Sequence, residues 1–484
     1  MTLASDGSID ANGLALLVAA ENGDTSGFLY RELADDLMRA ISRSGLPPGT
    51  KLPAERALAR ELGISRVTVA GAYRLLREDG WIDSRRGAGT FITGRRREEQ
   101  PWGSMLGSAS PDAMELINAA PRITPAVREA YAIGTAATDL DSVGYQPGGS
   151  YAVRSAIADR FTARGVPTRP NNILVTAGAS DAVHTVLESY VAPGDRVICE
   201  HPTYPGLLEE IRAVGGVAVP VPIDPLHPEA FVDAVARAAR QSAPTVAFLI
   251  PDFANPTGTL LPNEVRRRLA ATLIRYGILA VIDEVSTELS IDDLDAPIEP
   301  FGAATPEGTT ISLGGLSKVA WGGLRIGWVR ADVGAIGRLT DGYQRRQLSV
   351  SAVDQQVAVA VFADLDRIRE ERRDYLRIRR DRLVTDLSTL LPRWEFVVPA
   401  GGMSLWCRLP NGLSSTMVVE QAAQRGLRLA AGTRFGTGYD FDDHLRLPFV
   451  RSPEELAAAV GLLAGAAPVA PRRPATRTPA AMVI

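Results

Sequence analysis

Short apolar runs alternate with helical patterns over residues 114–466. Five of these runs have the length of a buried strand, namely 173–176, 196–199, 246–250, 279–282 and 310–313. Segments with the spacing of amphipathic helices separate them. Strands and helices that alternate in this way are typical of a mostly parallel sheet with helices on both faces. The pattern therefore predicts a large α/β domain that contains most of the chain.

A different pattern, with helices first and strands last, covers residues 26–93. Helical spacing runs over 28–43, a second helix is predicted from Pro53 to Gly63, and Ser65 is placed to cap a third that continues to Asp79. Two short strands are predicted at 81–84 and 90–93, which makes the block a mostly helical, winged helix-turn-helix domain. The third helix is expected to bury Val67, Val69, Tyr73, Leu75 and Leu76.

The remaining segments lack a pattern that would support a packed core. Residues 1–25 are mostly small and polar, and we expect a disordered arm there. Residues 94–113 are rich in Arg, Gly, Ser and Pro and are predicted to form a linker. Residues 467–484 repeat Pro, Arg, Ala and Thr, which predicts a disordered tail. Two folded domains, 26–93 and 114–466, are therefore expected.

Composition narrows the classes of protein that this chain can belong to. With 484 residues, a hydrophobic fraction of 45% and a net charge of −4, it has the composition of a soluble globular protein. It contains neither a run of about 18 apolar residues nor the pattern of a secretory signal. The two cysteines and four scattered histidines do not form a disulfide framework or a metal motif. A cytoplasmic protein without a metal or a membrane partner is expected.

Charge is distributed unevenly between the two predicted domains. Residues 28–97 carry 14 Arg and Lys against 8 Asp and Glu, a net charge of +6, so the rest of the chain carries −10. A basic segment on an acidic protein favours a polyanionic partner for that segment alone. Ser65, Arg66 and Thr68 would lie at the N-terminal end of the third helix, which in a helix-turn-helix faces the major groove of DNA.

This block resembles the winged helix-turn-helix of GntR-type bacterial regulators. The matching stretches are 46–56, 62–69 and 87–91, which begin with Leu-Pro-Pro-Gly, Leu-Gly-Ile-Ser-Arg and Gly-Ala-Gly-Thr-Phe. The resemblance implies a double-stranded DNA operator as partner and DNA contacts along the third helix and at the tip of the wing. The residues implied are Arg56, Ser65, Arg66, Thr68, Arg86 and Gly87.

Lysine is rare in this chain, which draws attention to the two positions that have it. Of 52 basic residues only Lys51 and Lys318 are lysines. A guanidinium cannot act as an amine nucleophile, whereas a desolvated lysine can lose its proton and form an imine with an aldehyde. Lys318 lies in Ser-Lys-Val, seven residues before Arg325 in a glycine-rich run. An imine-forming role is therefore our leading hypothesis for Lys318, and a surface role suffices for Lys51.

An aldehyde cofactor such as pyridoxal phosphate places further demands on the sequence. Gly178, Ala179 and Ser180 follow a predicted strand and open a helix, where backbone N–H groups can bind a phosphate. Asp283 ends a predicted strand, so its carboxylate would reach the edge of the sheet where α/β ligands bind and could face the pyridine nitrogen. Asn255, Tyr204 and Arg325 are candidates for the phenolic oxygen, the ring face and the phosphate.

Taken in chain order, these residues resemble those of a fold-type-I aminotransferase over about 350 residues. The order is the Gly178 cup, Tyr204, Asn255-Pro-Thr-Gly, Asp283, Ser-Lys318, Arg325 and Arg446. The resemblance implies pyridoxal 5′-phosphate as cofactor and large and small subdomains. It further implies that Arg446 holds the α-carboxylate of an amino acid. Tyr145 is similar to a residue that reaches the phosphate in a neighbouring subunit.

A GntR-like domain in front of such a domain resembles the MocR, or GabR-like, regulators. That resemblance implies a homodimer in which an amino-compound effector forms an external aldimine in place of Lys318 and alters DNA binding. Two alternatives remain open: an active aminotransferase with an added DNA-binding domain, and a regulator that has lost its cofactor. The presence of Lys318, Asp283, Asn255 and Arg325 argues against the loss of the cofactor.

The sequence also departs from the aminotransferase pattern. Related sequences carry a Tyr two or three residues after the Asp, where this chain has Val285 and Ser286. The position three residues before the lysine is Gly315 instead of a hydroxyl-bearing residue, and Ala179 stands in the cup where Ser or Thr is common. Fewer polar contacts to the cofactor favour a sensor over an enzyme with rapid turnover.

Overall fold

The computed structural model describes residues 8–22, 30–43, 46, 49–78, 81–85, 89–92, 113–410, 413–437 and 440–466. They divide into two compact units, one with the described residues up to 92 and one with residues 113–436 and 441–466. The predicted linker at 94–113 and the predicted tail at 467–484 lie almost entirely outside the described residues. Among the described residues, no helix is both long and apolar enough to cross a membrane.

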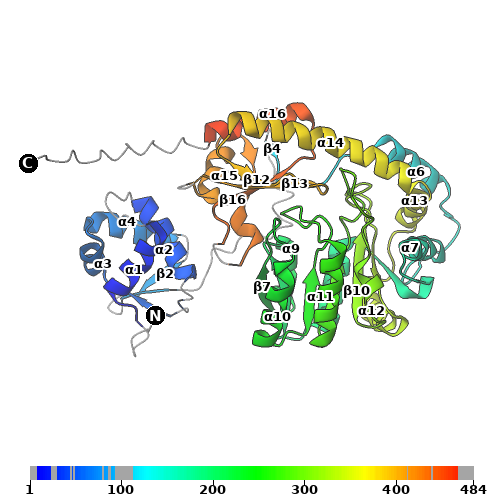
Figure 1. Cartoon of the computed structure of the whole chain (residues 1–484), viewed down its shortest axis with the longest axis horizontal. Helices are drawn as coiled ribbons and strands as arrows, with labels where there is room; N and C mark the ends of the chain where they lie inside the picture. Colours follow the sequence, from blue (N-terminus) through cyan, green and yellow to red (C-terminus); the bar gives the residue numbers. More distant parts are fainter. Residues whose placement is uncertain are drawn as a thin grey trace, which may run out of the picture. The chain divides into compact units, whose positions relative to one another are not determined.

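The N-terminal unit is a helical domain with a small sheet (Figure 1). Its helices are α1 (Ala11–Asn22), α2 (Tyr30–Arg43), α3 (Glu55–Leu62) and α4 (Arg66–Glu78). Strands β1 (Lys51–Leu52), β2 (Ile82–Arg85) and β3 (Gly89–Ile92) form an antiparallel sheet in the order β1-β3-β2. Gly63 ends α3 in the left-handed conformation, with φ of 67°, and thereby creates the turn before α4. The predicted helix-turn-helix with a wing is thus present.

Two expectations about this unit were wrong. Residues 11–22 form helix α1, and its Leu14 and Val18 are fully buried in one core with Leu33 and Leu37 of α2. Residues 11–22 are therefore helical, whereas a disordered arm was expected for residues 1–25. Two apolar side chains one turn apart hold this helix in the core. Val67 was expected on the buried side of α4, yet its side chain is 80% exposed.

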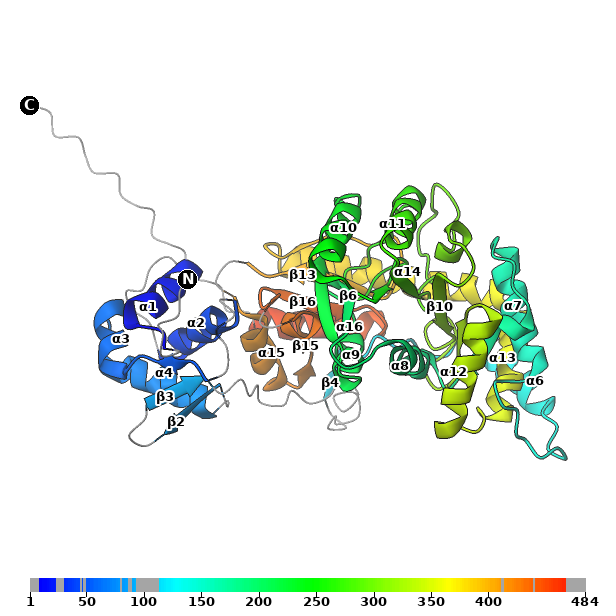
Figure 2. The same ribbon diagram turned by 90° about the horizontal axis from the view of Figure 1, so that it is seen from below.

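The large unit is built on a seven-stranded sheet of order β5-β11-β10-β9-β8-β6-β7, of which β6 and β10 are labelled in Figure 2. All neighbouring strands are parallel except β11, which runs antiparallel to both β5 and β10. The strands are β5 (Ile173–Thr176), β6 (Arg196–His201), β7 (Val217–Pro222), β8 (Val246–Leu249), β9 (Leu279–Asp283), β10 (Thr310–Gly315) and β11 (Gly327–Arg330). The prediction of a mostly parallel sheet is confirmed.

Side chains that alternate along the strands bury both faces of this sheet. Val197 of β6 packs with helices α8 (Ala179–Tyr190), α9 (Pro205–Ala213) and α12 (Val333–Arg346). Its neighbour Ile198 packs on the other face with α10 (Ala230–Ser242) and α11 (Asn263–Arg275). Because successive side chains of a strand point to opposite faces, one short apolar run serves two cores.

The large unit also contains a smaller four-stranded sheet of order β12-β13-β16-β15. Its strands are β12 (Glu395–Phe396), β13 (Ser404–Arg408), β15 (Ala430–Ala431) and β16 (His444–Pro448). Helices α15 (Ser415–Ala423) and α16 (Pro453–Ala466) accompany it. Figure 1 shows the long helix α14 (Leu365–Leu390) running from α6 (Pro125–Ala136) and α13 (Ala352–Ala363) to α16, so it ties the small sheet to the large one.

Candidate cofactor site and DNA-contact surface

Lys318 lies just beyond the end of β10 and is mostly buried. Its Nζ donates a hydrogen bond of 3.0 Å to the carbonyl of Ala119. Burial lowers the pKa of the lysine to about 8, with further lowering by Arg446 and Arg325 and opposition from Asp283. A desolvated amine with a pKa this close to neutral keeps a reactive neutral fraction at physiological pH.

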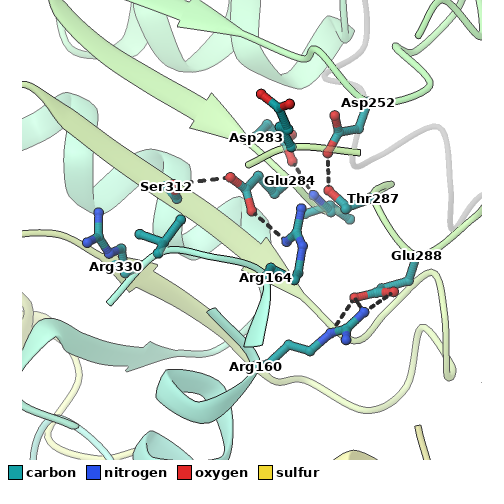
Figure 3. Close-up of polar contacts among 12 residues, drawn as sticks. Arg160, Arg164, Asp252, Asp283, Glu284, Thr287, Glu288, Ser312 and Arg330 are labelled. Carbon is teal, nitrogen blue, oxygen red and sulfur yellow. Dashed lines mark hydrogen bonds and ion pairs between the residues drawn. The ribbon is translucent and has the colours of Figure 1, made fainter. Parts of the chain in front are cut away.

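Asp283 is the last residue of β9, and its carboxylate emerges at the carboxyl edge of the parallel strands (Figure 3). Its Oδ1 accepts a hydrogen bond of 2.9 Å from the backbone N–H of Val285. Burial raises its pKa to about 6, while the hydrogen bond from the N–H of Val285 and the charge of Lys318 both lower it. The charges of this carboxylate and of the lysine act on each other, so the two groups lie in one neighbourhood.

Arg446 comes from β16 of the small sheet and is only 2% exposed. Its Nη1 donates to Oδ1 of Asn255 at 3.1 Å, and its Nη2 donates to the carbonyl of Ile117. The guanidinium lies 4.9 Å from the centroid of the Phe435 ring. Burial lowers the pKa of this arginine. An enclosed guanidinium next to the lysine is suited to a carboxylate ligand.

The predicted phosphate cup lies where β5 ends and α8 begins. Gly178 has a φ of 100°, which favours glycine, and it precedes Ala179 at the first position of a 12-residue helix. Nη2 of Arg325 donates to the carbonyl of Ala177 at 2.9 Å, and a Cβ at Gly178 would lie only 2.5 Å from this Nη2. The helix N-terminus and the adjacent guanidinium together favour an anion.

Strand β11 packs closely against the backbone of the cup. A Cβ at Gly327 of β11 would lie 2.3 Å from the backbone carbon of Gly178. Any other residue at 327 would therefore displace the cup. Gly315 is backed similarly, because a Cβ there would lie 3.3 Å from the Cβ of Ala179. Small residues at 179 and 315 thus fit each other, which accounts sterically for the missing hydroxyls.

The two tyrosines of the prediction have different surroundings. Tyr204 is mostly buried, and burial raises its pKa while a hydrogen bond with the Ser180 side chain opposes the shift. It therefore lies beside the cup, together with Ser180. Tyr145, in contrast, is 65% exposed. The structure brings Tyr204 into the site and leaves Tyr145 on the surface.

Two buried ion pairs near Asp283 were not found by sequence reasoning, and Figure 3 shows the first of them, between Arg164 and Glu284. Glu284 accepts from Nη1 of Arg164 at 3.1 Å and from the hydroxyl of Ser312 at 3.3 Å. Asp252 lies 2.5 Å from Arg266 and accepts a hydrogen bond from Thr287. Removing one partner of such a buried pair costs about 3–5 kcal/mol. The hydrogen bond from Thr287 to Asp252 joins the turn after β9, next to Asp283, to the loop after β8, which contains Asn255.

Two departures from the aminotransferase pattern, Val285 and Ser286, lie on this turn. The backbone N–H of Val285 is bonded to Asp283, and the carbonyl of Ser286 accepts from the N–H of Leu289 at 3.0 Å. Thr287 is the next hydroxyl along the chain, but it donates to Asp252. The backbone groups of Val285 and Ser286 and the hydroxyl of Thr287 are thus used within the turn, and none of these residues carries the phenol of a tyrosine.

In the N-terminal unit, the predicted DNA-contact residues gather around the start of α4. The Ser65 hydroxyl accepts from the N–H of Thr68 at 3.1 Å, so Ser65 caps the helix as predicted. Arg66 and Arg56 are exposed, and Arg66 donates to Oε2 of Glu55 at 3.4 Å. Val67 places an exposed apolar side chain at the same helix end. Arg86 and Gly87 lie outside the described residues.

Comparison with known families identifies both units. Residues 110–463 match the family described as aminotransferase class I and II. The chain belongs to this family. Residues 29–92 match the family of bacterial regulatory proteins named gntR. The two matches give the domain order of a MocR-like regulator, as the sequence indicated.

Relatives and solved structures agree with the two domains. The uncharacterized HTH-type transcriptional regulator YdfD of Bacillus subtilis is 24% identical over 442 residues, which are 84% of this chain and 89% of that protein. The 2-aminoadipate transaminase of Thermus thermophilus is 28% identical over 64% of this chain and 78% of its own length. The solved structure of LysN, an α-aminoadipate aminotransferase from Thermus thermophilus, has a TM-score of 0.68 at 26% identity, over 76% of this chain and 94% of that one.

Membership of this family makes pyridoxal 5′-phosphate the cofactor of the large domain. The residues present fit that group. A side chain at position 178 would fill the space between the cup and Arg325, whereas glycine leaves it open beside a cation and a helix N-terminus. The lowered pKa of Lys318 suits an amine that reacts with an aldehyde. The architecture is thus that of a pyridoxal-phosphate-dependent transcription regulator.

Proposed function

We propose that this regulator senses an amino compound that takes the place of Lys318 on the cofactor, and that this exchange alters its binding to an operator. The observation that carries the proposal is the proximity of Lys318 to a buried Arg446, whose charge lowers the pKa of the lysine. One cation can exchange an amine while the other holds a carboxylate. The effector class is therefore a primary amine that carries a carboxylate.

The roles of the site residues are part of this proposal. Bound pyridoxal phosphate supplies an aldehyde and a ring that withdraws electrons. Lys318 anchors the aldehyde carbon, Asp283 keeps a proton on the ring nitrogen, and Arg446 holds the carboxylate. The phosphate is bound by Gly178, Ala179, Ser180 and Arg325, the ring face contacts Tyr204, and Asn255 reaches the phenolic oxygen.

For the DNA-binding unit we propose contacts from the start of α4 and from the wing. Arg56, Ser65, Arg66 and Thr68 are the residues of the first contact surface, and the exposed positions of Arg56 and Arg66 support this role. Residues 86 and 87 are proposed from the resemblance alone. Exposed arginines at the start of a recognition helix can bind phosphates or guanine edges.

A homodimer is also part of the proposal. Several large apolar side chains remain exposed around α6 and α7 (Tyr151–Ala163) of the large unit. They are Ile133, Leu140, Val143, Tyr145 and Tyr151. Exposed apolar side chains that cluster in this way favour a protein interface. Tyr145 would then reach the phosphate of the partner copy, which accounts for its exposure in the single chain.

Active transamination is the second candidate, and one observation favours it. The pKa of Lys318 lies near 8, so the lysine can also act as a base at physiological pH. Val285 and Ser286 in place of the tyrosine argue for slow turnover at most. A single half-reaction, which converts one equivalent of amino acid, is compatible with both candidates.

The test is a titration of the holoprotein with amino acids, polyamines and taurine-like compounds. The visible absorbance of the lysine imine reports exchange, binding to DNA selected by the protein reports regulation, and keto-acid release reports turnover. We expect one α-amino acid class to change absorbance and DNA affinity at the same concentration. Keto acid in large excess over protein, without a change in DNA affinity, would instead establish the enzyme.

A further inference from the structure

One segment of backbone contacts both cations of the site. The carbonyl of Ala119 accepts from Nζ of Lys318 at 3.0 Å, and the carbonyl of Ile117, two residues earlier, accepts from Nη2 of Arg446. We call residues 113–123 the strap. Its middle is thus hydrogen-bonded to the two groups that the proposed function assigns to amine exchange and to carboxylate binding.

Both ends of the strap are fixed to the surrounding fold. At the first end, β4 (Met114–Glu115) pairs with β14 (Leu427–Arg428), and the N–H of Leu116 donates to the carbonyl of Arg428 at 2.9 Å. At the other end, Nη1 of Arg372 donates to the carbonyl of Arg122 at 3.0 Å, and Arg122 pairs with Glu455 at 3.2 Å. Only the middle of the strap therefore depends on the charged groups of the site.

The two contacts of the middle respond to different parts of a ligand. The contact to Ala119 requires an amine on Lys318 that is free to donate. The contact to Ile117 uses a guanidinium N–H of Arg446 that a carboxylate would need for a two-pronged hydrogen bond. A carboxylate therefore competes with the Ile117 carbonyl, whereas release of Lys318 creates the Ala119 contact.

We propose that the strap exchanges two anchors when the effector binds. It loses the hydrogen bond from Arg446 to Ile117 and gains the hydrogen bond from Lys318 to Ala119. The incoming nitrogen forms a bond to the aldehyde carbon, the bond from that carbon to Nζ breaks, and the two protons of the incoming amine end on Nζ. Lys318 then donates to Ala119, while the carboxylate of the effector displaces Ile117 from Arg446. This inference rests on the proposed function and describes how ligand binding at the same site changes the hydrogen bonds of the strap.

The position of the strap in the sequence gives this exchange a consequence. The strap begins at residue 113, where the predicted linker from the DNA-binding domain ends. The exchange moves the attachment of the strap from Ile117 to Ala119, and the strap is the part of the large domain that is covalently joined to the linker. A ligand that removes neither anchor, or both, would leave the strap in a different state from the true effector.

The test uses two stable, reduced adducts of the cofactor, added to the full-length apoprotein. One is N-(5′-phosphopyridoxyl)-L-leucine, the compound bound in the solved LysN structure. The other is its counterpart made with 3-methylbutylamine, which lacks only the carboxylate. Both leave the Lys318 amine free. With the leucine adduct, only the Ala119 anchor should remain. With the amine adduct, both anchors should remain.

A thiol at position 118 reports the strap, since the native Cys199 and Cys407 are fully buried. The rate at which Asn118→Cys reacts with a water-soluble disulfide reagent is measured with each adduct, with and without Lys318→Ala. Ser388→Cys, on the exposed end of α14, is the matched control. One lost hydrogen bond should raise the rate about fivefold. The order expected is amine adduct slowest, leucine adduct faster, and leucine adduct with Lys318→Ala fastest.

Equal rates at residue 118 for the two adducts, or no effect of Lys318→Ala, would overturn the strap proposal. A parallel change at residue 388 would do the same, since it would show a response of the whole domain. The reduced adducts need no exchange at Lys318. Failure of amines to displace the lysine would therefore sink the proposed function while the strap measurement still gives its own answer.

Discussion

The cations of the two candidate sites lie in opposite surroundings. At the start of α4, Arg66 has a side chain that is 58% exposed, and it pairs with the carboxylate of Glu55 at 3.4 Å. In the large unit, Arg446 is 2% exposed, and Lys318 is mostly buried next to it. The first kind of charge stays hydrated and can meet a polyanion at little cost.

The second kind of charge has lost its water, and its chemistry changes accordingly. Desolvation lowers the pKa of Lys318 to about 8, which makes an amine available that an exposed lysine would not provide. The difference teaches that the same residue class serves recognition in one unit and reactivity in the other. Burial, more than residue type, decides which of the two roles a cation takes.

The two lysines give the most direct test of whether burial decides the role of a cation. Lys318→Ala should abolish the absorbance of the lysine imine completely, because no other desolvated amine lies in the described part of the site. Lys51→Ala is the matched control, since Lys51 is exposed on β1. Absorbance spectra of both variants with pyridoxal phosphate give the answer. A retained imine band in Lys318→Ala would mean that burial does not select the reactive lysine.

The pH dependence of imine formation sharpens the same point. The rate in the apoprotein should rise tenfold per pH unit up to about 8 and level off above it, because the neutral amine forms as pH passes the pKa. At pH 7 the neutral fraction of Lys318 exceeds that of an ordinary lysine of pKa 10.5 by about 300-fold. Stopped-flow mixing with pyridoxal phosphate measures the profile. A rate that still climbs at pH 10 would contradict the lowered pKa.

Much of this site could be predicted because its residues sit where strands end. Asp283 closes an apolar run, Gly178 follows another, and Lys318 is one of two lysines, so sequence position alone marked them. The parallel sheet then brings such ends to one edge. The structure places Asp283, Lys318, Asn255 and Arg446 in one neighbourhood, although Asn255 and Arg446 are 191 residues apart.

The rest could not be predicted, for physical reasons that differ from residue to residue. Arg164 and Glu284 are 120 residues apart, and an Arg or a Glu in isolation resembles any surface charge. The contacts of Ile117 and Ala119 are made by backbone carbonyls, which leave no trace in residue type. Val67 occurs at a helical spacing that suggests burial, but the exposed end of α4 has no partner to cover it in this unit.

In the DNA-binding unit, the expected loss is smaller than in the cofactor site. Arg66→Ala should weaken binding to DNA selected by the wild-type protein roughly 10–100-fold, because one exposed contact to a base or phosphate is lost. Arg77→Ala is the matched control on the same helix, since Arg77 donates to Ser84 at 3.0 Å near the other end of α4. Fluorescence anisotropy with labelled DNA measures both. Equal losses for the two variants would place the contact surface elsewhere.

Glu55 gives the smallest and most specific effect. Its carboxylate accepts from both Nε and Nη2 of Arg66 at 3.4 Å, so the arginine must leave this acid to reach DNA. Glu55→Gln should therefore raise DNA affinity about two- to fivefold, the range expected for an exposed ion pair. Glu61→Gln removes the same charge from the same helix but faces Arg60 at 3.7 Å, and it should change affinity less. Because exposed charges are screened, the gap between the two variants should narrow as salt is added. A gap that persists at high salt would indicate that Arg66 is not the exposed, hydrated cation that distinguishes this unit from the Lys318 site.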